Sequence, residues 1–265
     1  MSLLTTSARN ARKQLGFRDG DTGTHSSRAL MLADLELLLR HATPDMAMPD
    51  YRRLVVDENL LAKPTRMTRE HTVRKLKALY GLAPDLPVFR TLVQLWPVDA
   101  QSRPLLAFLA AHARDPLLRL ATRPVLDLAP GEVIARPLVE TLIHEAFPGR
   151  FTKRTAEATA GHLLSSFRQS GHLEGTAETR RAHALATPVA AAYAFYLAYL
   201  EGLRAQRIFS SVWARILDVP DERLPDLAKD AARRGLMDYR QVGNVVELRF
   251  PNWLSTAEEE LTREQ

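Results

Sequence analysis

Apolar side chains recur every three or four residues in many short stretches of this chain, and this spacing restricts it to a bundle of helices. The clearest stretch runs from about 27 to 41, with Ser26 or Ser27 as its N-cap. Its apolar residues are Leu30, Met31, Leu35, Leu38 and Leu39. The 12 glycines stand among many alanine, leucine and arginine residues, a composition that favours helix over sheet. The 265 residues suffice for two or three small modules, so we predict a mainly α fold.

Two further segments complete a helix-turn-helix pattern in the N-terminal third. We expect a second helix over 49–58, with Pro49 in its first turn. A third helix should begin after the N-cap Thr68, end at Tyr80 and be closed by Gly81.

Prolines punctuate the middle of the chain at positions where several of them can open a helix. They are Pro97, Pro104, Pro116, Pro124, Pro130 and Pro137. The stretch 103–121 predicts two helices that meet near Asp115 and Pro116. A later helix should run from its cap Thr152 to Ser170, with Gly171 closing it. We see no clear internal repeat.

The most apolar stretch, 189–200, is about a dozen residues long, whereas a membrane-spanning helix needs about 20. It therefore predicts a buried core helix within a longer helix over 187–204. Residues 176–186 look like a loop, and helices are expected at 207–217 and 221–235. Two alternating runs then meet at Gly243-Asn244 and predict a β-hairpin. Two helices followed by a hairpin are the last parts of a winged helix.

These segments predict a mainly α protein with winged helix-turn-helix modules and a small C-terminal β-hairpin. The expected divisions are a flexible basic N-terminal arm (1–25), a helix-turn-helix module (26–85), a central helical region (86–175), a helical and winged-helix C-terminal module (176–254) and a polar tail (255–265).

The charge balance permits a polyanionic partner. Lysine and arginine number 36 against 31 acidic residues, which gives a net charge of +5. Arginine outnumbers lysine and suits bidentate contacts to phosphate or guanine, although a GC-rich genome would produce the same bias. The chain has no cysteine, which excludes disulfides, thiolate nucleophiles, iron–sulfur clusters and cysteine-bound zinc. The N-terminus lacks the apolar run of a signal peptide, so we expect a cytoplasmic protein without membrane association.

The helix predicted over 69–80 is the first candidate for binding nucleic acid. Its spacing turns Val73, Leu76 and Tyr80 inward, which leaves positive side chains on its outer arc and near its start. These are Lys63, Arg66, Arg69, His71, Arg74, Lys75 and Lys77. A basic helix N-terminus binds phosphate, and in a helix-turn-helix this helix enters the major groove. The alternative is a solvated basic face without a ligand.

Two weaker candidates follow. The helix over 152–170 carries a polar side with Lys153, Arg154, Thr159, His162, Ser165, Arg168 and Gln169. The C-terminal module carries Lys229, Arg233 and Arg234 on its last helix, with Arg240 and Arg249 on the predicted wing. Each set can contact phosphates. Each is equally typical of an ordinary surface helix, and winged helices also serve as protein-interaction modules.

Catalytic motifs are absent from the sequence. It contains neither GxxxxGK(S/T) nor GxGxxG, and it lacks HExxH and the GxSxG elbow. The eight histidines are scattered without metal-ligand spacing. We therefore predict a non-catalytic protein with no cofactor and no bound metal.

Three stretches together resemble the BrxA family of bacteriophage-exclusion (BREX) defence systems. The first is Asn59-Leu60-Leu61-x-Lys63-x-Thr65-x-x-Thr68-Arg69. The second joins Arg103-Pro104-Leu105-Leu106-Ala107-Phe108 with Arg114-Asp115-Pro116-Leu117-Leu118-Arg119. The third is Ser165-Ser166-Phe167-x-Gln169-Ser170-Gly171-His172-Leu173-x-Gly175.

This resemblance implies a small helical protein with winged helix-turn-helix modules that binds DNA. Family members are encoded beside a DNA methyltransferase, a large ATPase and a phosphatase-like protein, which are the implied partners. Related proteins have been compared with NusB-type antitermination factors, which makes RNA a second implied ligand. The resemblance covers roughly 26–175, and it assigns no role to 176–265.

The leading hypothesis is a non-catalytic accessory protein of a BREX-type system that binds double-stranded DNA mainly through phosphate contacts. A second hypothesis is a scaffold that recruits the methyltransferase or the ATPase without touching DNA. A third is NusB-like binding of RNA.

Overall fold

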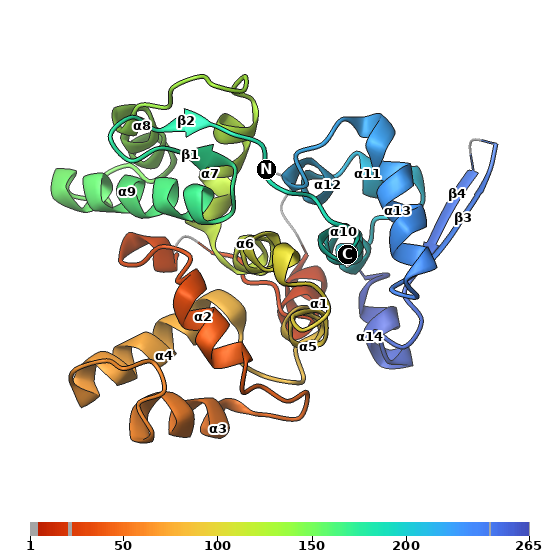
Figure 1. Ribbon diagram of the computed structural model, residues 1–265, viewed down its shortest axis with the longest axis horizontal. Helices are drawn as coiled ribbons and strands as arrows, with labels where there is room; N and C mark the ends of the chain where they lie inside the picture. Colours follow the sequence, from red (N-terminus) through yellow and green to blue (C-terminus); the bar gives the residue numbers. More distant parts are fainter. Residues whose placement is uncertain (1–4, 21–22, 244, 265) are drawn as a thin grey trace.

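The computed structural model of the chain describes residues 5–20, 23–243 and 245–264, and within these ranges the protein is mainly helical. Two short antiparallel strand pairs are its sheets. The prediction of a mainly α protein with a C-terminal hairpin is confirmed. Figure 1 shows three groups of elements arranged around the helix labelled α6 (Arg103–Arg114).

The first group is built from three helical segments. They are α2 (Leu32–Leu39), α3 (Met48–Arg52), which continues into the π-helical turn η2 (Arg53–Asp57), and α4 (Arg66–Tyr80). Pro49 lies in the first turn of α3, as predicted. Gly81 ends α4 with a positive φ of 100°, a conformation that glycine adopts without strain.

The second group follows the same order and adds strands. Its helices are α7 (Pro116–Leu126), α8 (Arg136–Ala146) and α9 (Lys153–Gln169). After α9, β1 (Leu173–Glu174) pairs with β2 (Arg180–Arg181), and Val133 bridges to Arg180 from the segment before α8. The stretch 176–186, expected to be a loop, therefore contains half of a strand pair. Two-residue strands are too short for a periodic sequence signal.

The third group begins with α10 (Pro188–Leu200). The helix predicted over 207–217 is interrupted: α11 (Gln206–Phe209) ends at Ser210, and Ser211 caps α12 (Val212–Ile216). A 3-10 turn, η4 (Asp221–Arg223), leads into α13 (Leu224–Arg233). The hairpin of β3 (Asp238–Val242) and β4 (Val245–Arg249) is confirmed, although Asn244 of its predicted turn lies outside the described residues.

The centre of the molecule holds α5 (Pro87–Leu95) and α6 (Arg103–Arg114), which follows the 3-10 turn η3 (Ala100–Ser102). Residues 105–111 of α6 are almost fully buried, and α10 is buried on nearly every side. The prediction that 189–200 forms a core helix is confirmed. Tyr193 of α10 donates a hydrogen bond to the Val88 carbonyl oxygen at 2.8 Å, which ties α10 to α5.

Both ends of the chain are more structured than the sequence indicated. The expected flexible arm contains α1 (Thr6–Leu15), capped by Thr5, with Ala8, Ala11 and Leu15 buried. The expected polar tail contains α14 (Thr256–Leu261), which has a capping box. These helices contact each other, and an Arg90–Glu258 ion pair of 2.8 Å holds α14 against α5. Tertiary contacts stabilise both short helices, which their own sequences would leave marginal.

The helix predicted over 27–41 begins five residues late. Residues 24–26 form a 3-10 turn, η1 (Thr24–Ser26), and Met31 precedes α2 with a φ of 55°. Neither Ser26 nor Ser27 caps α2; the Leu32 amide instead donates to Gln169 Oε1 of α9 at 3.1 Å. Contacts with the second group thus override the local helical pattern.

None of the described helices combines the length and hydrophobicity needed to cross a bilayer.

Candidate nucleic-acid interface

A threonine begins α4, but it is not the residue predicted from the sequence. The Thr65 hydroxyl oxygen accepts a hydrogen bond from the Thr68 amide at 3.1 Å, so Thr65 is the N-cap and Thr68 lies in the first turn. Thr72 in turn donates to the Thr68 carbonyl oxygen at 2.8 Å. This start adds a helical turn and places Arg66 and Met67, which is 72% exposed, at the open end of the helix.

The outer arc of α4 carries the exposed cations that the sequence predicted. His71, Arg74 and Lys77 are exposed, and Lys75 is partly buried beside them. The Arg74 guanidinium lies 3.0 Å from Nδ1 of His71. The inward residues Val73 and Leu76 pack in the core, as expected from the helical spacing. The structure therefore brings together four of the seven candidates of this helix.

Lys75 lies in a strongly positive environment. Partial burial lowers the pKa of Lys75, and the neighbouring charges of Arg74, Arg28 and Arg18 lower it further, while Asp115 acts in the opposite direction. Arg28 and Arg18 belong to the segment between α1 and α2, which no sequence pattern connects with this helix. An anion bound here would stabilise the protonated amine and the adjoining guanidinium groups.

Arg28 also links α4 with α9. It lowers the pKa of His162, a residue of α9 whose pKa is lowered mainly by burial. Arg28 is exposed, and its guanidinium donates to the carbonyl oxygen of Ser27 at 3.0 Å. The turn η1, which Arg28 follows, contacts both α4 and α9, so Arg28 adds a positive charge near both helices. The sequence gave no signal for this role, because it placed Arg28 in the first turn of the helix predicted over 27–41.

Three other candidates near the start of α4 are engaged within the protein. Lys63 pairs with Asp34 at 2.7 Å, and Arg66 pairs with Asp57 at 3.2 Å. Arg69 is half-buried and donates to the Val56 carbonyl oxygen at 2.9 Å, which holds α4 against η2. These contacts give Arg69 a packing function, so it is a weaker candidate for phosphate contact than the cations of the outer arc.

The polar side of α9 is largely covered. His162 donates to the His25 carbonyl oxygen at 2.9 Å, Gln169 accepts from Leu32, and Thr159 is fully buried. Arg168 donates to Thr179 at 3.0 Å and so ties the helix to the β1–β2 connection. The exception is its first turn, where Lys153 and Arg154 are exposed.

The starts of α4 and α9 repeat the same sequence pattern. T-x-x-T-x-E-x-T begins at Thr65 and again at Thr152, 87 residues later. The contacts also repeat, because the Thr155 amide donates to Thr152 at 3.2 Å and Thr159 donates to the Thr155 carbonyl oxygen at 2.7 Å. No internal repeat was predicted from the sequence, since the intervening connections differ and the shared positions are few.

Nearby carboxylates neutralise three of the five cations predicted to bind DNA in the C-terminal module. Arg233 forms an ion pair with Asp230, Lys229 lies 3.6 Å from Asp226, and Arg249 pairs with Glu247. Arg234 and Arg240 are exposed and have no ion pair within the described ranges. In Figure 1 this region lies on the opposite side of the molecule from α4, so the two sets do not form one surface.

A serine, a histidine and an aspartate form a chain of contacts that the sequence gave no reason to expect. Nε2 of His25 lies 2.9 Å from the Ser166 hydroxyl, and Nδ1 of His25 lies 3.0 Å from Asp115. All three side chains are buried, and the Ser166 hydroxyl donates to the carbonyl oxygen of His162. The order matches a catalytic triad, but the hydroxyl is committed to a backbone acceptor and closed off from solvent.

Asp115 gives this chain of contacts its structural role. Its carboxylate accepts from the amides of Thr24, His25, Leu117 and Leu118, so it caps α7 and fastens η1 at once. These bonds and the contact with His25 outweigh the cost of burial and lower the pKa of Asp115 to about 2.

No group of histidine, aspartate and glutamate residues suited to a metal ion occurs among the described residues. The sequence matches no protein-family model, and comparison with curated proteins gives no significant match.

Proposed function

We propose that this protein binds double-stranded DNA without catalysing a reaction on it, and that the outer arc of α4 is the contact surface. The observation that carries the proposal is the position of Lys75 among Arg74, Arg28 and Arg18, with no carboxylate paired to Lys75 in the described part of the chain. Cations that two segments bring to one surface favour a polyanion.

The arrangement of the elements supports this choice of ligand. In the first group, α4 is the third helix, the place of the recognition helix in a helix-turn-helix. The second group has the order helix, bridge residue, helix, helix and strand pair, which is the order of a winged helix. We therefore infer two related modules, of which the first makes the main phosphate contacts.

Membership of the BrxA family, and with it a role in a BREX-type phage-defence system in the bacterial cytoplasm, is part of the same proposal. It rests on the three stretches of sequence quoted above. Deleting the gene from a host that carries the complete system should lower its resistance to phage, as measured by plating efficiency. Unchanged plating would contradict the defence role and leave the DNA-binding proposal to its own test.

The binding test uses salt dependence. Fluorescence anisotropy with a duplex of about 20 base pairs is measured over a series of salt concentrations. Replacing Arg74, Lys75 and Lys77 together with alanine should weaken binding and reduce the logarithmic salt slope by up to about three units. Adding Arg28→Ala should reduce it by about one more. All four side chains lie at or near the surface, so the fold should persist.

The matched control removes three cations from another helix. Lys229 and Arg233 lie on α13, Arg234 is its C-cap, and two of the three already pair with aspartates. Their triple alanine variant should change the slope by less than the α4 variant does. Parental binding by the α4 variant at every salt concentration would overturn the proposal. Tighter binding of single-stranded RNA than of duplex DNA would favour a NusB-like ligand instead.

One observation favours a second function for the C-terminal hairpin. Val242 and Val245, at its tip, are 81% and 72% exposed. Apolar side chains in this position are typical of a protein-interaction site, which supports a scaffold that recruits the defence methyltransferase or ATPase. Replacing both valines with aspartate should abolish such an association while DNA binding persists, and co-purification of the components would measure it.

A further inference from the structure

A cavity of about 490 Å³ lies beside α1, and none of the residues predicted to bind DNA lines it. Its lining comes from α1, from the segment that follows α1, from the start of α5 and from the end of α6. The lining residues are Arg9, Asn10, Lys13, Phe17, Arg18, Asp19, Leu86 and Arg114. Its volume is that of a site for a small organic ligand.

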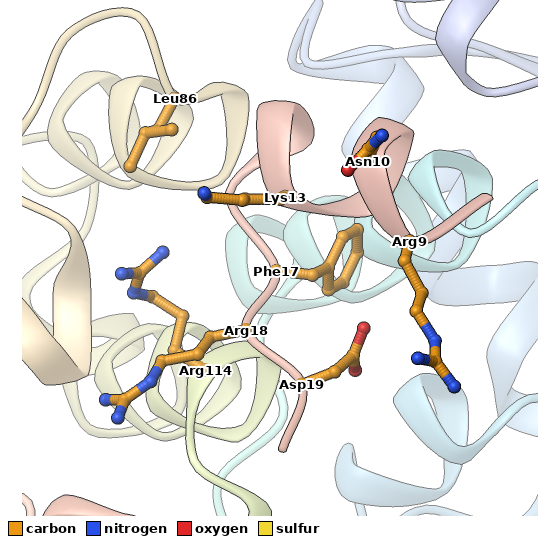
Figure 2. A pocket seen from close by; sticks show the side chains of 8 residues that line it. All are labelled: Arg9, Asn10, Lys13, Phe17, Arg18, Asp19, Leu86 and Arg114. Carbon is orange, nitrogen blue, oxygen red and sulfur yellow. The ribbon is translucent and has the colours of Figure 1, made fainter. Parts of the chain in front are cut away.

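The cavity is strongly positive. Figure 2 shows Lys13, Arg18 and Arg114 extending to one side of Phe17, with Arg9 on the other side. Asp19 is the single acidic residue among the described lining residues, and Arg12 already pairs with it at 3.1 Å. Lys13 and Arg9 are exposed and form no ion pair within the described ranges.

Arg114 is partly buried, whereas Arg9 and Lys13 are exposed. Its guanidinium donates to the carbonyl oxygens of Ala78 and Gly16, and it has no carboxylate partner in the described part of the chain. Burial and the charge of Arg18 lower the pKa of Arg114 to about 10. The two carbonyl groups carry only partial charges, which leaves the positive charge near the cavity uncompensated.

We propose that this cavity binds a phosphate group carried on an organic part of about nucleotide size. Lys13, Arg18 and Arg114 would hold the phosphate, because guanidinium and ammonium groups together suit its several oxygens. Phe17 and Leu86 supply an apolar wall for the organic part. A single carboxylate would neutralise less of the charge, and inorganic phosphate alone would leave much of the volume empty.

The test uses deoxyadenosine monophosphate (dAMP) as the probe and isothermal titration calorimetry at fixed ionic strength. Lys13→Glu reverses an exposed charge at the mouth of the cavity and should weaken dAMP binding by about tenfold or more. Arg207→Glu is the matched control: Arg207 is an exposed residue of α11 that does not line the cavity, and its variant should bind within about twofold of the parent. Thermal unfolding of both variants establishes that they are folded.

The outcomes separate this proposal from the proposed function. The α4 triple variant should keep its dAMP affinity, because its substitutions lie outside the cavity. If duplex DNA displaces dAMP, the phosphate comes from a nucleic-acid strand; if it does not, the ligand is a free nucleotide. Absence of saturable dAMP binding up to about 10 mM, or equal affinity in the Lys13→Glu and Arg207→Glu variants, would overturn the proposal.

Discussion

The first and second helical groups have the same order of three helical segments. They differ in whether another segment covers the third helix. Three helical segments recur in each, and the helices α4 and α9 begin with the same threonine pattern 87 residues apart. The outer arc of α4 is open, whereas the middle of α9 lies under residues 24–32. A repeated sequence pattern therefore specifies the helix and its cap, while a distant segment decides whether the helix presents a usable surface.

The segment 24–32, which covers α9, is attached to the Asp115 carboxylate, and this attachment tolerates little change. Asp115 holds the amides of Thr24 and His25, and a Cβ atom on Gly23 would lie 2.2 Å from the Asp115 carboxylate. The chain can approach the carboxylate this closely only because position 23 has no side chain. The difference in exposure between α9 and α4 therefore depends most on Asp115.

Replacing Asp115 with alanine should have the largest effect on stability. It removes the acceptor of four amides and leaves His25 buried beside an empty space, so we expect a loss of about 3–5 kcal/mol in the free energy of unfolding. Urea denaturation followed by circular dichroism measures it. Asp127→Ala is the control, because Asp127 is an exposed partner of Arg215 and should change stability little. Equal losses in the two variants would show that Asp115 does not hold the cover.

Acid should loosen the same attachment. The pKa of Asp115 is lowered from 3.8 to about 2 in the folded protein, so its carboxylate stabilises the fold above pH 4. That contribution, about 2 kcal/mol, should disappear as the pH falls from about 4 to about 2. Urea unfolding over this range measures it, with Asp115→Asn as the reference. If parent and variant lose stability in parallel, the carboxylate of Asp115 is not the titrating group.

Local patterns in the sequence predicted those parts of the fold that local contacts determine. The junction of α6 and α7 at Asp115, the cap Thr152 and the C-terminal hairpin follow from short-range chemistry, and each is confirmed. The late start of α2 was not predictable in this way, because its first amide is bonded to Gln169, 137 residues away. The helices near the two termini were missed because contacts between distant parts of the chain stabilise them.

In the candidate site, too, the sequence predicted local features but not contacts between distant segments. Helical spacing correctly placed Arg74 and Lys77 on the exposed side of α4. It could not show that Arg69 donates to a backbone carbonyl of another segment, or that Arg28 joins the basic surface. The contact of these residues with DNA stays a prediction.

Substitutions in the exposed first turn of α9 test whether α4 makes more of the phosphate contacts than α9 does. Replacing Lys153 and Arg154 with alanine should reduce the salt slope of DNA binding by no more than about two units, less than the α4 triple variant. These are the α9 cations that remain open, since Arg168 is tied to Thr179. The same anisotropy series measures the difference. A larger effect from the α9 pair would reverse the assignment and make the second group the principal contact surface.

The smallest expected effect concerns the feature that the two groups share. Thr65 and Thr152 cap their helices with nearly equal geometry, at 3.1 and 3.2 Å from the accepted amide. Thr65→Ala and Thr152→Ala should therefore each lower the free energy of unfolding by about 1 kcal/mol, while serine at either position should restore most of the loss. Urea denaturation of the four variants measures this. Because the two caps are equivalent, a difference in DNA binding reflects the helix and not the cap: Thr65→Ala should weaken binding more than Thr152→Ala, by loosening the start of the open helix. If Thr152→Ala weakens DNA binding equally, both helices contact the ligand, and the cover on α9 does not exclude it from the interface.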